Sequence, residues 1–246
     1  MATDQGVGSS NLLTHVETSK VNHFRGFLFL EKGYPIYVIY DILILAGERN
    51  MTEREWDQKL HIDTIGRDAS VEDAYHHPYE PTPYSVLVRL ADSDYINEEN
   101  IVVDYGCGKG RVGFFLSSQI DCKVIGIEFD VKIYGQAYDN LSGFVARREK
   151  VEFLCIGAEN YEIEEADVFY FFNPFSVEIL QSVIGKIKKS YYNNPREMKL
   201  FFYYPSDEYI SYLMTVSELC FLDEIDCSDL FESNKNREKI MIFEMM

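Results

Sequence analysis

The sequence predicts an α/β fold in which helices cover both faces of a mostly parallel sheet. Beyond about residue 79, short apolar runs alternate with longer segments of helical period, which is typical of strand–helix–strand units. One run, 101–105, breaks into a turn with three alternating glycines. The last two runs are separated only by the polar segment 228–237, so we expect them to pair as an antiparallel hairpin.

Seven strands and five helices are expected in the second part of the chain, and 246 residues suit one α/β domain with an appended segment. Residues 1–78 lack a clean period and are predicted to form an N-terminal helical or irregular extension ahead of a domain over 79–246. Within it, the apolar stretch 34–47 is too short for a membrane span and favours a buried helix. The expected strands are 101–105, 123–128, 151–155, 167–173, 197–204, 217–225 and 237–244, and the expected helices are 83–91, 109–119, 131–146, 175–190 and 207–215.

Charge and cysteine content exclude several classes of protein. The net charge is −18, with 41 acidic against 23 basic residues, and a field of that sign repels phosphate backbones. The five cysteines are scattered and form no Cys-x-x-Cys pair, which argues against a disulfide framework and against zinc. The first residues lack the basic and apolar regions of a signal peptide. We therefore expect a cytoplasmic protein without a membrane partner, for which nucleic acid is a disfavoured partner.

The glycine turn after the run 101–105 predicts a ligand-binding loop. Asp104 ends the run, and Gly106, Gly108 and Gly110 follow at alternate positions, where glycine permits positive φ and close approach of a ligand. The helix expected next would point free N–H groups at this loop. Arg111 stands where a dinucleotide fingerprint needs glycine, and the loop does not match a P-loop either.

A second strand supports a nucleotide-type cofactor, since 123–128 ends in Glu128, where a carboxylate can accept both ribose hydroxyls. The pattern Asp-x-Gly-x-Gly-x-Gly, followed by this acid, resembles the first motif of the class I S-adenosylmethionine (SAM)-dependent methyltransferases. The resemblance covers about 79–246 and implies a Rossmann-like methyltransferase fold with SAM as cofactor and S-adenosylhomocysteine as product. The alternative for the fold is a NAD-type or other nucleotide-binding fold. The alternative for Glu128 is a helix-capping or solvated acid without a ligand.

The resemblance also implies the cofactor-binding residues. Asp104 and the glycines would hold the methionine portion, Glu128 the ribose and the turn 157–159 the adenine, although a glycine replaces the acid usual in that turn. The segment 79–85 resembles aromatic-Pro-Thr segments of some non-SET lysine methyltransferases and of uncharacterised bacterial relatives; it could fold over the methionine end, with Thr82 capping a helix that starts at Pro83. The expected cofactor set is Tyr79, Thr82, Asp104, Gly106, Cys107, Gly108, Gly110, Glu128, Phe129, Gly157, Ala158, Glu159 and Asn173.

The acceptor site is expected after the fourth strand. There Asn173-Pro174-Phe175 resembles the Asn-Pro-Pro-Tyr/Phe motif of amino-group methyltransferases, without its second proline. An amide oxygen could orient the acceptor amine, but Asn173 and Pro174 also suit a helix cap and first helical residue. Tyr203 lies at the same sheet edge and could line a substrate pocket, with core packing as the alternative interpretation. Ser206 is expected to cap the helix that follows.

These residues together predict a SAM-dependent methyltransferase that acts without a metal on a nitrogen of a protein side chain or a small amine. Asp167 and Glu80 are candidate proton acceptors, and His76 and His77 are interpreted as loop histidines. A nucleic-acid methyltransferase and a non-catalytic SAM-binding protein are the alternatives. The identity of the acceptor and the formation of a homo-oligomer stay open.

Overall fold

The computed structural model describes residues 51–68, 75, 77–232 and 237–246. The chain divides into two compact units, Met1–Asn50 and Met51–Met246, and the second unit carries the fold described below. The expectations for residues 1–50, including a buried helix at 34–47, lie outside the described residues, as does His76.

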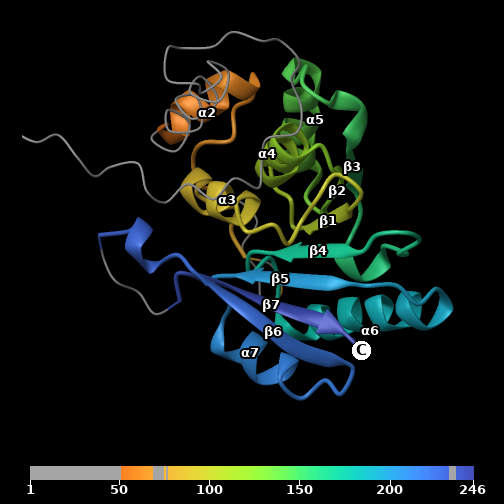
Figure 1. Cartoon of the computed structure of the whole chain (residues 1–246). Helices are drawn as coiled ribbons and strands as arrows, with labels where there is room; N and C mark the ends of the chain where they lie inside the picture. Colours follow the sequence, from red (N-terminus) through yellow and green to blue (C-terminus); the bar gives the residue numbers. More distant parts are fainter. Residues whose placement is uncertain (1–50, 69–74, 76, 233–236) are drawn as a thin grey trace, which may run out of the picture. The chain divides into compact units, whose positions relative to one another are not determined.

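The second unit is built on one seven-stranded sheet with the order β3-β2-β1-β4-β5-β7-β6 (Figure 1). Strands β1 to β5 are parallel to one another, and β7 lies between β5 and β6 and is antiparallel to both. This confirms the mostly parallel sheet and its C-terminal antiparallel hairpin. The strands are β1 (Ile101–Tyr105), β2 (Lys123–Glu128), β3 (Val151–Cys155), β4 (Val168–Phe171), β5 (Lys199–Tyr203), β6 (Leu219–Asp226) and β7 (Lys239–Met245).

Helices cover both faces of the sheet, as predicted, and each face has its own hydrophobic core. On one face lie α2 (Glu53–Leu60), α3 (Tyr84–Ala91), α4 (Arg111–Ile120) and α5 (Val131–Gly143), and on the other lie α6 (Val177–Asn193) and α7 (Asp207–Leu213) (Figure 1). Short 3-10 turns complete the unit, namely η1 (Arg148–Lys150), η2 (Ala158–Asn160) and η3 (Ser228–Leu230).

An aromatic row fixes the ends of three neighbouring strands on the α6 face. Tyr105, Phe171 and Phe202 are register partners across β1, β4 and β5. The ring centroids of Tyr105 and Phe171 are 5.1 Å apart, and those of Phe171 and Phe202 are 4.6 Å apart. Because side chains alternate along a strand, Asp104 points to the opposite face from Tyr105, toward α4.

The compact unit begins earlier than the expected domain boundary at residue 78. Trp56 and Leu60 of α2 are buried in the core, and the Trp56 ring lies 5.5 Å from the ring of Tyr84 and 5.0 Å from that of Phe115. Burial of a tryptophan and a leucine removes much apolar surface from water. Residues 51–68 therefore belong to the same folded unit as the sheet, and the expected boundary at 78/79 is wrong.

Two expected helix starts are also corrected. Helix α3 begins at Tyr84 with Pro83 as its N-cap residue, and the hydroxyl of Thr82 hydrogen-bonds the Tyr170 hydroxyl at 3.1 Å instead. Helix α6 begins at Val177, so Asn173 and Pro174 do not start it. The cap expected at Ser206 is confirmed, since its hydroxyl oxygen accepts from the Tyr209 N–H at 3.1 Å.

Candidate functional site

A pocket opens where the carboxyl ends of β1, β2 and β4 meet, which is where ligands bind in open α/β sheets. Its walls come from the glycine loop, the end of β2, the turn at η2, the segment after β4 and a segment before α3, residues 77–82, which we call the strap. The expected site residues that line the pocket are Tyr79, Thr82, Asp104, Gly106, Cys107, Gly108, Glu128, Phe129, Ala158, Glu159, Asn173, Pro174 and Phe175.

The glycine loop adopts a conformation that side chains oppose. Gly106 and Gly108 have φ values of 74° and 56°, in the left-handed region that favours glycine. A Cβ at Gly106 would lie 2.3 Å from Cβ of Pro174, and one at Gly108 would lie 2.2 Å from ring carbons of Tyr79. The third glycine, Gly110, does not line the pocket; a Cβ there would lie 2.4 Å from the Phe153 ring, so packing against the core explains it.

Asp104 is a buried carboxyl group with an unsatisfied oxygen atom within the described part of the chain. Its residue is 4% exposed, and no hydrogen-bond partner reaches its Oδ2 atom among the described residues. Burial, with a smaller effect from the charge of Glu128, raises the pKa of Asp104 to about 8. Because an unpaired buried carboxylate is costly, this group is suited to a cationic ligand group.

Glu128 joins the end of β2 to the glycine loop. Its Oε2 atom accepts from the Gly108 N–H at 3.0 Å, and its Oε1 atom accepts from the Asp130 N–H at 2.9 Å. Burial raises the pKa of Glu128, and these backbone hydrogen bonds oppose the shift. Each carboxylate oxygen keeps a further lone pair, so Glu128 can hold the loop and still accept a ligand hydroxyl.

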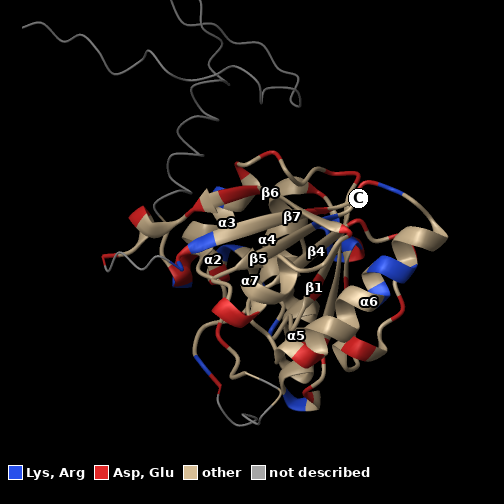
Figure 2. Cartoon of the chain, turned by 90° about the horizontal axis from the view of Figure 1, so that it is seen from below, with Lys and Arg blue, Asp and Glu red and all other residues tan. Residues whose placement is uncertain are grey.

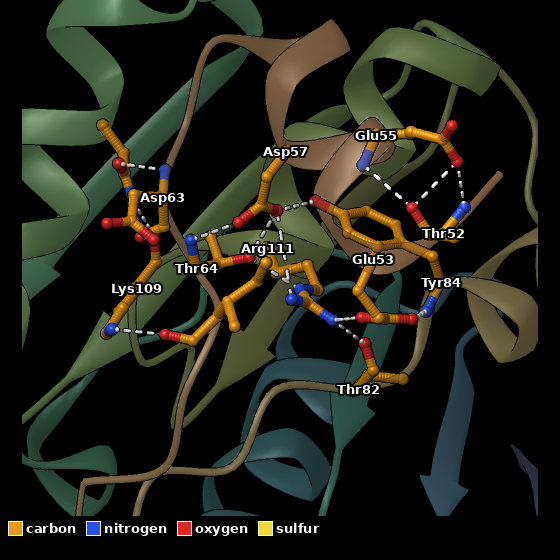
Figure 3. A network of polar contacts seen from close by, with 12 residues as sticks. Thr52, Glu53, Glu55, Asp57, Asp63, Thr64, Thr82, Tyr84, Lys109 and Arg111 are labelled. Carbon is orange, nitrogen blue, oxygen red and sulfur yellow. Dashed lines mark hydrogen bonds and ion pairs between the residues drawn. The ribbon is translucent and has the colours of Figure 1, made fainter.

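Arg111 occupies the centre of a buried polar network that joins α2 to α4 (Figure 3). Its Nε donates to the Thr64 hydroxyl at 2.7 Å, and its Nη1 donates to the Thr82 carbonyl at 3.1 Å and pairs with Glu53. Asp57, whose carboxylate accepts from the Thr64 N–H at 2.6 Å, lies 3.9 Å from Nη2. The charge of Arg111 is therefore satisfied within the protein.

The strap passes beside the glycine loop and is anchored at several points. Tyr79 exchanges backbone hydrogen bonds with Asp68, at 2.9 and 3.1 Å, and its hydroxyl donates to the Thr64 carbonyl at 2.7 Å. The Nδ1 atom of His77 lies 2.7 Å from the carbonyl oxygen of Asn173. The strap is thus bonded both to the Arg111 network and to the segment after β4.

Asn173 uses its side-chain amide to join two loops. Its Nδ2 donates to the Tyr204 carbonyl, and its Oδ1 accepts from the Ser206 N–H at 3.1 Å. Asn173 and Tyr204 both have positive φ, at 41° and 50°, which is uncommon outside glycine. The amide thus holds the loop after β5 against the pocket wall, and as it stands its oxygen already has a donor.

Tyr203 and Gly157 do not line the pocket, although both were expected in the site. Tyr203 is 2% exposed, and its hydroxyl donates to Glu238 at 2.7 Å. Its ring packs at 4.7 Å on Phe172, which does line the pocket. Core packing, the alternative interpretation of Tyr203, is therefore what the structure shows.

Asp167 immediately precedes β4, at the end of the parallel strands opposite the pocket. Its carboxylate accepts from the Ile101 N–H at 2.8 Å and from Asn100 Nδ2 at 3.0 Å, which places it at the amino ends of the parallel strands. This removes Asp167 as a proton acceptor in the pocket. Glu80, the other candidate, lies in the strap and lines the pocket.

Sequence reasoning missed several lining residues. Asp130 follows β2 and caps α5 through its Oδ1 atom, which accepts from the N–H groups of Lys132 and Ile133; an acid between a strand and a helix was the available signal. Tyr170 and Phe172 share a face by strand alternation. The other lining residues that were not predicted for the site are His77, Pro78, Pro81, Arg111, Val112, Ile127, Ile133, Ile156 and Ile179.

None of the helices in the described part of the chain has the length and apolarity needed to cross a membrane. Among the same residues, no three His, Cys, Asp or Glu side chains are grouped so that they could hold a metal ion.

Known proteins share the fold of this chain. No family model matches the sequence. A protein-lysine N-methyltransferase from Saccharolobus islandicus (strain REY15A) is 31% identical over 67 residues, which cover 27% of this chain and 42% of that protein. The chain thus spans less than half the length of the curated relative that it matches.

Solved structures match over about two thirds of the chain. Pyrococcus abyssi tRNA (uracil-54, C5)-methyltransferase, in complex with S-adenosylhomocysteine, has a TM-score of 0.51 and 12% identity and covers 68% of this chain and 40% of its own. A TehB-like SAM-dependent methyltransferase from Corynebacterium glutamicum has a TM-score of 0.47 and 16% identity, with coverages of 64% and 86%. The first likeness, with the sheet order, shows the Rossmann-like fold of class I methyltransferases, as the glycine motif predicts.

Proposed function

We propose that this chain is a SAM-dependent methyltransferase that transfers the methyl group to a nitrogen of a protein side chain or of a small amine. The observation that carries the cofactor assignment is the buried carboxyl group of Asp104, which has no hydrogen-bond partner at Oδ2 among the described residues and lines a pocket beside the glycine loop. The α-ammonium of a methionine moiety would supply a cationic partner for this carboxyl group.

The remaining lining residues fit the other parts of SAM. Gly106 and Gly108 line the pocket and present backbone without a side chain to a ligand, and Glu128 has lone pairs free for ribose hydroxyls. On the far side, Ala158 and Ile156 offer apolar surface next to Glu159, which suits an adenine ring with a polar edge. We assign these groups to the methionine portion, the ribose and the adenine in that order.

Charge supports nitrogen acceptors of cationic or neutral character over nucleic acid. Five acidic residues line the pocket, and Arg111, paired with Glu53, is its one Lys or Arg among the described residues. Acidic residues also outnumber basic ones in the whole sequence, 41 against 23, and Figure 2 shows where they lie in the described part of the chain. The match to a protein-lysine N-methyltransferase, limited to 67 residues, points to the same class of acceptor.

Methyl transfer from SAM to a nitrogen requires mainly that the protein bind and orient the two reactants. SAM, when bound, supplies an activated methyl group on a sulfonium. The loops after β4 and β5, joined by Asn173, would hold the acceptor nitrogen in line with that group, and positioning of this kind accounts for much of the barrier reduction. Phe172, Phe175 and the strap would exclude water from the acceptor nitrogen.

Methyl-labelled SAM with cell extract tests the proposal. Label incorporated into protein or small amines, and lost in Asp104→Ala, is the expected result. Label in RNA or DNA would select the nucleic-acid alternative, and tight SAM binding without any label transfer would select a non-catalytic SAM-binding protein.

A further inference from the structure

Glu80 differs from most of the acidic side chains that line the pocket, because no side chain or backbone group of the described residues holds its carboxylate. Glu128 and Asp130 accept backbone hydrogen bonds, and Glu159 accepts from the Asn160 side chain at 3.0 Å. Among the described residues, no hydrogen bond or ion pair reaches the carboxylate of Glu80, which is exposed at the pocket wall.

Two carboxyl groups of the pocket, those of Asp104 and Glu80, thus have no ion-pair partner among the residues that the structure describes, and they differ in burial. Asp104 is buried below the glycine loop, while Glu80 is exposed on the strap. Methyl transfer to an amine brings two cationic groups to such a site, the α-ammonium of the cofactor and the ammonium of the acceptor. The buried carboxyl group, beside the glycine loop, suits the cofactor, and the exposed one suits an acceptor that arrives from solvent.

The strap holds Glu80 in place without engaging its side chain. Tyr79 is fixed by Asp68 and Thr64, and His77 is fixed by the Asn173 carbonyl. Next to Glu80, Pro81 restricts the backbone, and Thr82 is buried against Tyr170. A carboxylate on a fixed backbone costs less entropy when it binds a cation than one on a free loop.

We propose that Glu80 binds the methyl acceptor as an ammonium ion and so selects cationic primary amines for this site; this rests on the proposed function. The ammonium releases one proton to water at the open side of the pocket. The nitrogen lone pair then forms the new N–C bond while the C–S bond breaks, and its electron pair stays on sulfur as a neutral thioether. The methylated amine carries the positive charge away.

Calorimetry separates this role from the cofactor site. A lysine-containing peptide with blocked termini is titrated into the full chain saturated with S-adenosylhomocysteine, for the wild type, Glu80→Gln and the matched control Glu164→Gln. Glu164 is an exposed acid outside the pocket. We expect peptide binding to weaken about tenfold or more in Glu80→Gln, the size typical for loss of a charge-assisted contact, and to stay unchanged in Glu164→Gln.

Binding of S-adenosylhomocysteine, measured first in each variant, shows that the pocket is intact and reports on the proposed function by itself. If S-adenosylhomocysteine does not bind the wild type, the proposed function fails. If it binds and the peptide binds Glu80→Gln as tightly as wild type, or binds neither protein, the role of Glu80 is refuted while the cofactor site stands. With a turning-over peptide, the proposal further expects a raised KM with little change in kcat.

Discussion

The ring of Tyr79 lies against Gly108 so closely that a Cβ at position 108 would be 2.2 Å from two ring carbons. The contact joins the strap to the glycine loop, and the Tyr79 hydroxyl, bonded to the Thr64 carbonyl at 2.7 Å, keeps the ring from moving aside. The absence of a side chain at Gly108 thus makes room for the Tyr79 ring and for the packing of the strap.

Gly108→Ala is therefore expected to damage the site. Alanine at φ 56° is strained by about 1–2 kcal/mol, and its methyl group must displace the Tyr79 ring. We expect a loss of more than about 1.5 kcal/mol in the free energy of unfolding, measured in urea, and weaker S-adenosylhomocysteine binding by about tenfold or more.

Gly185→Ala is the matched control. Position 185 lies within α6, and no described atom lies within 4 Å of a Cβ built there. Because alanine favours a helix interior, this variant is expected to gain about 0.5–1 kcal/mol in the free energy of unfolding. Equal effects of the two substitutions would contradict the assigned packing at Gly108.

The raised pKa of Asp104 predicts a pH dependence of stability. The folded, cofactor-free protein keeps this proton up to about pH 8, whereas an unfolded chain gives it up near pH 4, the ordinary range of about 3.9 for aspartate. The unfolded state therefore binds fewer protons between these values, so the free energy of unfolding falls as pH rises through them. In Asp104→Asn this contribution should vanish, which urea titrations between about pH 5 and pH 8 will show.

The same carboxyl group should release a proton when the cofactor binds. An ammonium placed beside Asp104 favours its charged form, so S-adenosylhomocysteine binding near pH 6.5, where an α-amino group of pKa about 8 is already protonated, is expected to release up to about one proton. Calorimetry in buffers of different ionisation enthalpy measures this number. A release that is the same in Asp104→Asn would show that another group is the source.

Arg111→Met should destabilise the unit strongly. The substitution leaves Asp57, whose side chain is 5% exposed, and the partly exposed Glu53 without their cation. Loss of one partner of a buried pair costs about 3–5 kcal/mol, measured as the free energy of unfolding in urea. Arg89→Met is the control, because its partner Asp229 is 66% exposed and such surface pairs contribute about 0–1 kcal/mol.

Asn173→Gly separates positioning from backbone strain. Glycine accepts the positive φ of this position, so the variant loses only the amide that holds Tyr204 and Ser206. Turnover should fall about tenfold or more because the acceptor wall loses its support, while S-adenosylhomocysteine affinity stays within about twofold. Wild-type turnover in Asn173→Gly would remove Asn173 from the proposed site.

The sequence predicted the sheet well, because its strands are local patterns. The runs 101–105, 123–128 and 151–155 coincide with β1, β2 and β3. Expected strand 167–173 is longer than β4, which ends at Phe171, since the positive φ of Asn173 departs from extended backbone. Gly106, Gly108 and Glu128 also line one pocket, and their binding of a cofactor stays a prediction.

Tertiary contacts explain what the sequence did not predict. Helix α2 has a local signal, the capping box in which Thr52 and Glu55 bond each other's backbone N–H groups, yet its attachment depends on Arg111, 58 residues away from Glu53. Thr82 likewise has the composition of a cap, but the nearby Tyr170 hydroxyl competes for its side chain. The hydrophobic periodicity of a sequence does not indicate such distant side-chain contacts.

Isothermal titration of S-adenosylhomocysteine into the full chain tests the central claim most directly. We predict one site per chain with a dissociation constant on the order of micromolar, weakened about tenfold or more in Asp104→Ala and Gly108→Ala and unchanged in Gly185→Ala. Absence of binding to the wild type, or binding that is insensitive to both pocket substitutions, would contradict the assignment of this pocket to SAM.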